Sequence, residues 1–253
     1  MSQHSAVILA AGKGTRMKSD LAKVLHRIED RALLQFVLDA CAPLELDRTV
    51  VIVGHQADTV SALCEANGVD TALQAEQLGT GHAVDQARAL LQGRPGQVLV
   101  LCGDVPLLRT ATIEALVRKT SETGAAATVL TAIAEDATGY GRVVRDSDGN
   151  GAGHVTAIVE QKDASEAQLM IREYNTGTWC FDNARLWDLL DRLDTDNAQG
   201  EYYLTDVVEL LVADGQLVEA LVCEDEREVQ GINTLADLER AAADWTRMGD
   251  LPK

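Results

Sequence analysis

The sequence predicts an α/β fold in which a mostly parallel sheet is covered by helices on both faces. Over roughly the first 135 residues, short apolar runs alternate with longer segments whose apolar residues recur at helical spacing. The short runs are apolar throughout, as is typical of parallel strands buried on both faces. Three of them end in small or polar pairs, at 11–12, 54–55 and 103–104, on the edge of the sheet where ligands bind in such folds.

The elements of this first part follow one another without a linker. The helix that follows the second strand is expected to stop at Gly68, after Asn67, because residues of these types commonly end helices. Strands are expected at 6–10, 49–55, 71–74, 97–104 and 125–133, and helices at 31–41, 57–68, 81–93 and 110–124.

The alternation changes after residue 135. Residues 140–162 are typical of two strands joined by a Gly/Asp/Asn turn, which predicts an antiparallel hairpin. Residues 172–182 predict a further strand. Helices at about 183–193, 204–214 and 234–247 and a strand at 217–223 complete the chain. We therefore expect a single domain over 1–253, with a nucleotide-binding part to about 135 and an α+β part from about 136.

Composition narrows the class of protein. The chain has 253 residues, and no apolar run approaches the roughly 20 residues of a membrane span. The start of the chain lacks the basic and apolar regions of a signal peptide, so we expect a cytoplasmic protein without a membrane partner. Five scattered cysteines without a C-x-x-C pair disfavour a disulfide framework or a zinc site. A net charge of −18 disfavours a nucleic-acid partner.

Residues 8–25, ILAAGKGTRMKSDLAKVL, form a glycine loop with four cations in this acidic chain. The Walker A pattern fails, because no glycine lies five residues before Gly12 and Gly14 follows Lys13. The dinucleotide fingerprint fails as well, because Met17 stands where a third glycine is needed. The residue types still suit phosphate: glycines let backbone N–H groups close around oxygen atoms, and cations add charge.

The charged residues Arg16, Lys23 and Asp104 each have two interpretations. Arg16 can make a forked contact to phosphate and Lys23 can act as a mobile charge, but exposed loops commonly carry solvated cations. Asp104 follows a buried strand and can hold Mg²⁺, but an aspartate there can equally cap the next helix. Taken alone, these residues leave both interpretations of Asp104 about equal.

Longer motifs carry a resemblance to a family. Residues 9–26, LAAGKGTRMKSDLAKVLH, closely resemble the signature of the sugar-1-phosphate nucleotidylyltransferases, in particular the uridylyltransferase part of bifunctional members that use N-acetylglucosamine 1-phosphate. Further motifs are similar to that family, in family order and over nearly the whole chain. They are LQAEQLGTGHAV (73–84), LCGDVPLL (101–108), TGYGRVVRD (138–146), IVEQKDAS (158–165), YNTGTWCF (174–181), DNAQGEYYLTDVVELL (196–211) and VQGINT (229–234).

The resemblance implies a Rossmann-like nucleotide-diphospho-sugar transferase fold with an added antiparallel hairpin portion. It implies that UTP and N-acetylglucosamine 1-phosphate react to give UDP-N-acetylglucosamine, a cell-wall precursor, and pyrophosphate. The sugar-phosphate oxygen would attack the α-phosphorus directly, in line with the leaving pyrophosphate and assisted by Mg²⁺, with catalysis by positioning and charge. The part from about 136 would bind the sugar.

The resemblance also implies roles for particular residues. Arg16, Lys23 and Asp104 would be catalytic, and Asp104 and Asn233 would hold the Mg²⁺. Nucleotide-binding positions would be Leu9, Ala10, Ala11, Gly12, Gly14, Lys23, Gln74, Gln77, Gly79, Thr80 and Gly103. Sugar-binding positions would be Gly141, Glu160 and Asn175. His82 is expected to help start a helix, without a catalytic role.

The chain departs from the family pattern in three respects. Ala22 stands where the family usually has proline, and Cys102 where it often has an aromatic residue, which leaves sugar and base preference open. The hexapeptide repeats of the trimerising β-helix in bifunctional members do not occur in this sequence, so we expect a monomer. Two alternatives stay open: the same chemistry with another sugar phosphate or nucleotide, and a catalytically weak nucleotide-sugar-binding protein.

Overall fold

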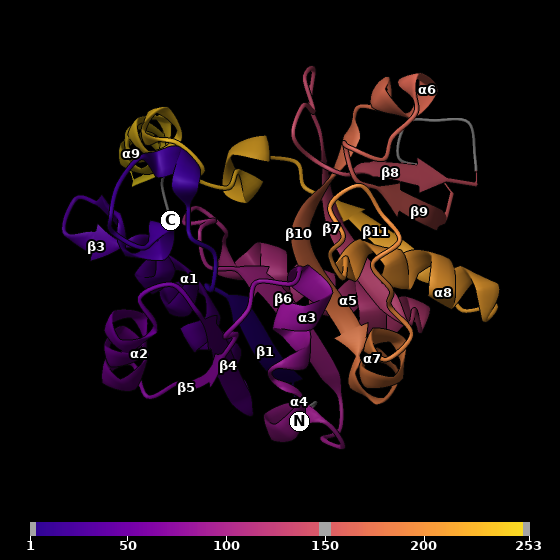
Figure 1. Cartoon of the computed structure of the whole chain (residues 1–253), viewed down its shortest axis with the longest axis horizontal. Coiled ribbons are helices and arrows are strands. Elements are labelled where there is room, and N and C mark those ends of the chain that lie inside the picture. The colour runs from indigo at the N-terminus through magenta and orange to yellow at the C-terminus, as the bar shows by residue number, and fades with distance from the viewer. Residues whose placement is uncertain (1–3, 147–152, 250–253) are drawn as a thin grey trace.

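The computed structural model describes residues 4–146 and 153–249, and its sheet and helices follow the predicted order (Figure 1). The strands of the main sheet are β1 (His4–Leu9), β4 (Arg48–Val53), β5 (Asp70–Leu73), β6 (Gln97–Cys102), β7 (Ala127–Ile133), β8 (Arg142–Arg145), β9 (Val155–Val159), β10 (Glu173–Asp182) and β11 (Val218–Val222). The helices are α1 (Leu33–Cys41), α2 (Ala57–Ala66), α3 (Thr80–Asp85), α4 (Arg88–Leu91), α5 (Thr110–Thr123), α6 (Glu166–Leu169), α7 (Asn183–Leu190), α8 (Val207–Ala213) and α9 (Leu235–Gly249).

The sheet is mostly parallel, as predicted. Its main strand order is β11-β7-β10-β6-β1-β4-β5, and β1 pairs in parallel with both β4 and β6. Leu9 is paired with Ile52 on one side and with Cys102 on the other. The loops that follow these three strands therefore leave the sheet at the same edge.

One strand runs against the others in the centre of the sheet. β10 lies antiparallel between β6 and β7, and Trp179 pairs with Val100 and Val129. A bulge between Asn175 and Thr178 interrupts its ladder with β7. The predicted strand at 172–182 is thus confirmed, and its antiparallel position is a feature that the sequence pattern did not predict.

Helices cover both faces of the sheet, as the continuous apolar strands predicted. On one face, Val7, Val98 and Phe181 pack with buried residues of α3, α4, α7 and α8. On the other face, Ile8 and Leu99 pack with buried residues of α1, α2 and α5. Alternate residues of β1 point to opposite faces, so both faces must be apolar.

The C-terminal helix returns to the N-terminal part of the molecule. In Figure 1 α9 lies beside α1 and the small β2–β3 hairpin (Arg27–Ile28 and Arg31–Ala32). Phe36 and Trp245 meet edge to face with ring centroids 4.9 Å apart, within a cluster that also contains Met17 and Ile232. This packing carries the segment before α9 toward the loop that follows β1.

Two predicted helices differ in detail. The helix expected over 81–93 is divided into α3 and α4, because the amides of Gln86 and Ala87 bond three residues back, to Ala83 and Val84. The helix expected from 31 begins at Leu33, since the two residues before it form β3.

The antiparallel pairing of β8 with β9 confirms the predicted hairpin. Most of the predicted turn, 147–152, lies outside the described residues. Within the described ranges, none of the helices has the length and apolar character needed to cross a membrane.

Candidate active site

The loop after β1 is packed against the segment that carries Lys23. Gly14 has a φ of 61°, and a Cβ built there would lie 2.7 Å from the Cβ of Lys23, so only glycine allows this approach. Gly14 precedes a short 3₁₀ helix, Thr15–Met17. Its Met17 is buried and anchors the turn, which leaves Arg16 exposed beside it.

Four predicted residues from three distant segments form one hydrogen-bonded cluster. The ammonium of Lys23 forms an ion pair with Asp104 and donates to Asn233 Oδ1 at 3.3 Å. Arg16 Nη2 donates to the same Asn233 oxygen at 2.8 Å. The side chains of Lys23 and Asp104 are 19% and 14% exposed, so the pair is mostly shielded from water. We name Arg16, Lys23, Asp104 and Asn233 the charged cluster.

The backbone brings the two predicted metal ligands together. Ile232 N donates to Asp104 O at 2.9 Å, and a Cβ on Gly231 would lie 3.6 Å from Asp104 Oδ2 and 3.8 Å from Asn233 Nδ2. An oxygen of Asp104 and one of Asn233 contact the same ammonium, so both converge on a point that holds positive charge. One carboxylate and one amide oxygen are hard ligands that suit Mg²⁺.

The donor set for a metal is small. Among residues 4–146 and 153–249, no group of three or more His, Cys, Asp or Glu side chains is arranged to hold a metal ion. Mg²⁺ usually keeps several waters and takes few protein ligands in addition to phosphate oxygens. The pair Asp104 and Asn233 therefore fits Mg²⁺ that is bound together with a phosphate ligand.

A cavity of about 350 Å³ opens at the carboxyl edge of β1 and β6. Every predicted nucleotide-binding residue lines it except Gly14 and Gly103. Gly14 packs on Lys23 as described, and Gly103 N donates to Leu9 O at 2.9 Å, which joins the two strand ends. The lining residues are Leu9, Ala10, Ala11, Gly12, Lys23, Val24, Gln74, Gln77, Gly79, Thr80, Ala83, Cys102, Asp104 and Glu201.

The charged cluster separates this cavity from another one. Lys23 and Asp104 line the 350 Å³ cavity, whereas Arg16 and Asn233 line a neighbouring cavity of about 420 Å³. Tyr140 and Gly231 also line the larger cavity. A phosphate chain held by the cluster could therefore extend from one cavity toward the other.

The amide of Gln74 has a defined orientation in the cavity wall. Gln74 is 3% exposed, and its Nε2 donates to Gly79 O at 3.1 Å. A carbonyl can only accept, so the nitrogen must face Gly79. The same Nε2 lies 3.1 Å from His82 Nδ1. The Oε1 atom is thereby left for a hydrogen-bond donor in the cavity.

Two distant motifs form one wall of this cavity. Tyr202 N donates to Leu78 O at 2.8 Å, and Gly81 N donates to Tyr202 O at 2.8 Å. Thr80 Oγ1 accepts from Leu204 N at 3.0 Å. The segment 78–81, which begins α3, is thus docked by backbone bonds on the segment 202–204.

The three predicted sugar-binding residues also lie together. A Cβ on Gly141 would lie 3.2 Å from Glu160 Oε1, and Asn175 N donates to Gly141 O at 2.9 Å. The bulge of β10 turns Asn175 Oδ1 onto Gly177 N at 2.9 Å. Gly177 in turn contacts Cys102, whose Sγ would lie 2.8 Å from a Cβ at that position. The three predicted sugar-binding residues therefore adjoin the wall of the 350 Å³ cavity.

Glu160 is a half-buried carboxylate in an acidic environment. Burial raises its pKa, and a hydrogen bond from Thr205 Oγ1 at 3.3 Å opposes that rise. Glu160 also lines a cavity of about 340 Å³ with Asp163, Asp206 and Glu209. Its carboxylate can accept hydrogen bonds from hydroxyl or amide groups.

Four residues that line the 350 Å³ cavity were not among the predicted site residues. They are Val24, Ala83, Cys102 and Glu201. Cys102 and Glu201 lie inside motifs that carried the resemblance, so their place in those motifs was an available signal. Val24 and Ala83 are apolar, and nothing distinguishes them in sequence from core residues.

Comparison with known proteins gives a consistent picture. The MobA-like NTP transferase domain matches residues 6–206. "Bifunctional protein GlmU" of Exiguobacterium sibiricum is 48% identical over 97% of this chain and 56% of its own length. The protein of the same name from Bacillus cereus is 50% identical over 95% of this chain and 51% of its own length. The chain thus spans about half the length of the curated relatives it matches.

A solved structure shares the fold. A UDP-glucose pyrophosphorylase crystallised with UDP-glucose superposes with a TM-score of 0.77, covering 98% of this chain and 100% of its own. Sequence identity is 14%, so the similarity concerns the arrangement of the elements.

Proposed function

The chain belongs to the MobA-like NTP transferase domain family, and on that premise we propose that it transfers a uridylyl group from UTP to N-acetylglucosamine 1-phosphate. The products would be UDP-N-acetylglucosamine and pyrophosphate. The relatives named GlmU, at about half identity over nearly the whole chain, support this assignment. The motifs that resemble the uridylyltransferases support it independently of overall identity.

The charged cluster is the single observation that carries the proposal. It brings Arg16, Lys23, Asp104 and Asn233 together at the mouth of a cavity lined by the residues expected to bind a nucleotide. Two cations beside one carboxylate can hold a polyphosphate. Nucleotidyl transfer needs positioning and charge stabilisation rather than a covalent nucleophile.

In the proposed reaction, an oxygen of the sugar phosphate attacks the α-phosphorus of UTP. A bond forms between that oxygen and the α-phosphorus, and the bond from the α-phosphorus to the bridging oxygen of the pyrophosphate breaks. Lys23, on the cavity side of the cluster, would hold the nucleotide and sugar phosphates. Arg16, which faces the adjoining 420 Å³ cavity, would hold the leaving pyrophosphate.

Mg²⁺ is the proposed cofactor, with Asp104 and Asn233 as its protein ligands. When bound, it would neutralise the charge that develops on the phosphate oxygens. The Lys23 ammonium now contacts both ligand oxygens, so it would turn toward the phosphates as the metal binds.

The orientation of Gln74 supports a uracil base. Gln74 lines the cavity and its Nε2 is engaged by Gly79, so its Oε1 would accept from the N3–H of uracil, whereas cytosine presents an unprotonated ring nitrogen at this position. Backbone groups of Gly79 and Thr80 would approach the same edge of the base. The base would therefore be read by one oriented amide and by the main chain.

On the sugar side, Gly141, Glu160 and Asn175 would contact N-acetylglucosamine. Glu160 accepts from hydroxyl or acetamido N–H groups, and Asn175 can both donate and accept. Gly141 keeps the space beside Glu160 free of a side chain.

The proposal is tested by pyrophosphate release across a matrix of nucleoside triphosphates and sugar 1-phosphates with Mg²⁺. We expect the highest kcat/KM for UTP with N-acetylglucosamine 1-phosphate. Turnover with a different pair would reassign the substrate, and binding without turnover for any pair would favour a nucleotide-sugar-binding protein.

The cluster itself is tested by Asp104→Ala. We expect kcat to fall by about 10²–10³-fold, the scale on which loss of a charge-stabilising group acts, in a protein that still unfolds in one cooperative transition. Asp58→Ala, an exposed aspartate in the first turn of α2, is the matched control and should keep parent activity. Unchanged turnover in Asp104→Ala would disprove the metal assignment.

A further inference from the structure

The residue just before Lys23, Ala22, has a buried backbone N–H that needs a hydrogen-bond acceptor. Ala22 is fully buried and caps the short 3₁₀ helix Lys23–Leu25 with φ −54° and ψ 136°. Its carbonyl accepts from Leu25 N at 2.9 Å. Its own N–H points away from that helix and needs an acceptor from elsewhere, because a buried unpaired N–H costs free energy.

Gln56 supplies that acceptor from a different part of the chain. Ala22 N donates to Gln56 Oε1 at 2.9 Å, and Gln56 Nε2 donates to Asp20 O at 2.8 Å. One amide thus bonds both sides of the turn at 20–22. The donor and acceptor of the main chain cannot exchange roles, so the orientation of the Gln56 amide is defined.

The position of Gln56 links this contact to the sheet. Gln56 lies just after β4, at the N-cap of α2, and adopts a left-handed conformation with φ 53° and ψ 42°. Residues before it are anchored, since His55 N donates to Ala11 O at 3.2 Å. The side chain therefore connects the end of β4 to the segment that carries Lys23.

We propose that Gln56 is a positioning residue that holds Lys23 in place for the reaction through the backbone of residues 20–22. This inference rests on the proposed function, because it concerns how the charged cluster is held. Lys23 is the next residue after the bonded N–H, and its stem packs against Gly14. Without the Gln56 side chain, the turn at 20–22 loses both hydrogen bonds that link it to the end of β4.

The primary test is Gln56→Gly. Glycine adopts φ 53° without strain, so the substitution removes the side chain and keeps the backbone conformation accessible. We expect kcat/KM for UTP to fall about tenfold, the size expected from loss of a positioning hydrogen-bond pair. Glu45→Gly is the matched control, because Glu45 is an exposed residue with φ 49° and ψ 47° away from the cluster. It should keep parent kinetics.

A second variant distinguishes positioning from general destabilisation. The φ of Ala22 lies within the range of proline, which has no N–H to satisfy. In Gln56→Gly the position facing the Ala22 nitrogen is vacated, so the proline ring can enter. We expect Ala22→Pro to raise kcat/KM several-fold in the Gln56→Gly background and to lower it in the parent, where the proline ring would collide with Gln56 Oε1, now 2.9 Å from Ala22 N. A loss caused by poor folding would not be recovered in this pairwise way.

Amide hydrogen exchange gives a readout that does not depend on activity. We expect exchange at Ala22 to accelerate about tenfold or more in Gln56→Gly and not in Glu45→Gly. Parent exchange and parent kcat/KM in Gln56→Gly would overturn the inference, and so would a loss of activity that Ala22→Pro leaves unchanged. If the parent releases no pyrophosphate with any substrate pair, the proposed function fails, whereas the exchange result still decides whether Gln56 orders the turn.

Discussion

Gly79 shows how a single residue can fix the wall of the cavity. Its φ of 115° and ψ of 174° lie in a region that is essentially restricted to glycine. A Cβ there would lie 2.5 Å from Tyr202 O and 2.7 Å from Tyr202 N. Both the backbone conformation and the contact exclude any side chain.

We predict that Gly79→Ala lowers the free energy of unfolding by at least about 3 kcal/mol, because backbone strain adds to overpacking. Gly93→Ala is the control, since Gly93 has φ 79° and a Cβ at that position would meet no atom within 4 Å, so strain alone should cost about 1 kcal/mol there. Urea unfolding of both variants measures the difference. Equal losses would show that the contact with Tyr202 contributes nothing.

Cys102 illustrates a residue whose size matters more than its chemistry. Burial raises the pKa of its thiol to about 12, so the thiol stays protonated near neutral pH. Its Sγ packs against Gly177 and lies 3.5 Å from the carbonyl oxygen of that residue. Cys102 therefore shapes the boundary between the 350 Å³ cavity and the predicted sugar-binding residues.

At the scale of elements, a buried ion pair ties the hairpin to the sheet. Arg145 in β8 donates to Glu173 in β10 through Nε at 2.8 Å and Nη2 at 2.6 Å, and both side chains are below 10% exposed. Thr131 in β7 donates to the same carboxylate at 2.7 Å. These bonds hold β8, and with it Gly141 just before its first residue, against β10.

We predict that Glu173→Gln destabilises the protein by about 3 kcal/mol or more, because it leaves the Arg145 charge buried without its partner. Asp70→Asn is the control, since the cross-strand pair of Arg48 and Asp70 is 28% and 45% exposed and should be worth less than about 1 kcal/mol. Chemical denaturation of both variants tests this. If Glu173→Gln costs no more than Asp70→Asn, the buried pair does not stabilise the hairpin.

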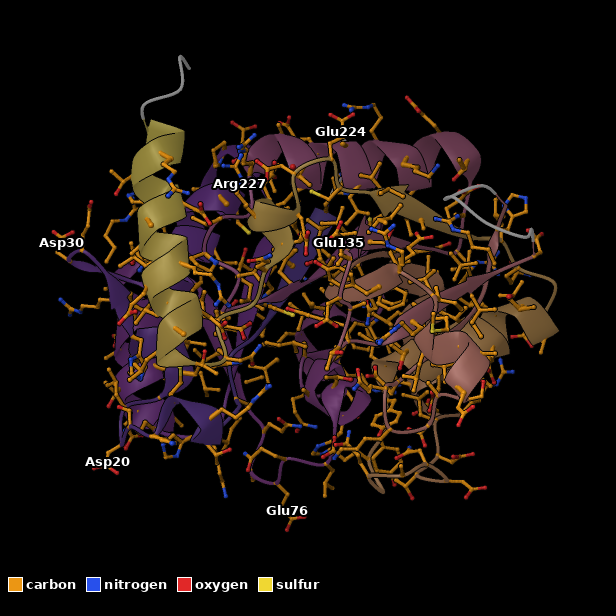
Figure 2. The ribbon with its side chains drawn as sticks, turned by 90° about the horizontal axis from the view of Figure 1, so that it is seen from above. Asp20, Asp30, Glu76, Glu135, Glu224 and Arg227 are labelled. Carbon is orange, nitrogen blue, oxygen red and sulfur yellow. The ribbon has the colours of Figure 1, made fainter. Side chains whose placement is uncertain are left out.

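Across the whole molecule, acidic side chains outnumber basic ones by 40 to 22. Many of them project from the surface, as Asp20, Asp30 and Glu76 do in Figure 2. The acidic 340 Å³ cavity is different, because Asp206 is half-buried there among other carboxylates. Burial, followed by the nearby charge of Glu209, raises its pKa to about 6.

The raised pKa of Asp206 determines how the free energy of unfolding changes with pH. The ordinary pKa of the group is 3.8, so the folded state binds the proton more tightly than the unfolded state. Ionised Asp206 therefore costs stability above pH 6, and the cost disappears below about pH 4. Besides Glu209, the carboxylates of Asp194, Glu160 and Asp163 contribute to this cost.

We predict that Asp206→Asn raises the free energy of unfolding at pH 8 by about 1 kcal/mol, allowing for solvent screening of a half-exposed group. The gain should shrink as pH falls toward 4. Asp214→Asn should show the opposite sign, because a hydrogen bond from Arg192 lowers the pKa of Asp214. Denaturation midpoints at several pH values test both, and a gain for Asp206→Asn that is independent of pH would contradict the electrostatic cause.

Local patterns in the chain were sufficient to predict the order of the main elements and the loop that starts the site, but not the β2–β3 hairpin or α6. A strand that is buried on both faces is apolar throughout. An amphipathic helix repeats its apolar residues about every three or four positions. Both patterns can be recognised within a short segment of sequence. The glycine loop could also be predicted, because glycine itself favours the positive φ that the turn at Gly14 adopts. The nucleotide-binding positions that the resemblance implied line the 350 Å³ cavity, except Gly14 and Gly103. Four further lining residues, Val24, Ala83, Cys102 and Glu201, were not among those positions.

Other features depend on which distant segments meet, and no local pattern encodes that. Arg16 and Asn233 are 217 positions apart yet share a hydrogen bond, because α9 returns to pack on the N-terminal elements. The antiparallel insertion of β10 between β6 and β7 brings Asn175 to Gly141. The link from Gln56 to Ala22 likewise exists only once β4 lies beside β1. Contacts between distant segments need the whole core to form, and for that reason they became visible only in the folded molecule.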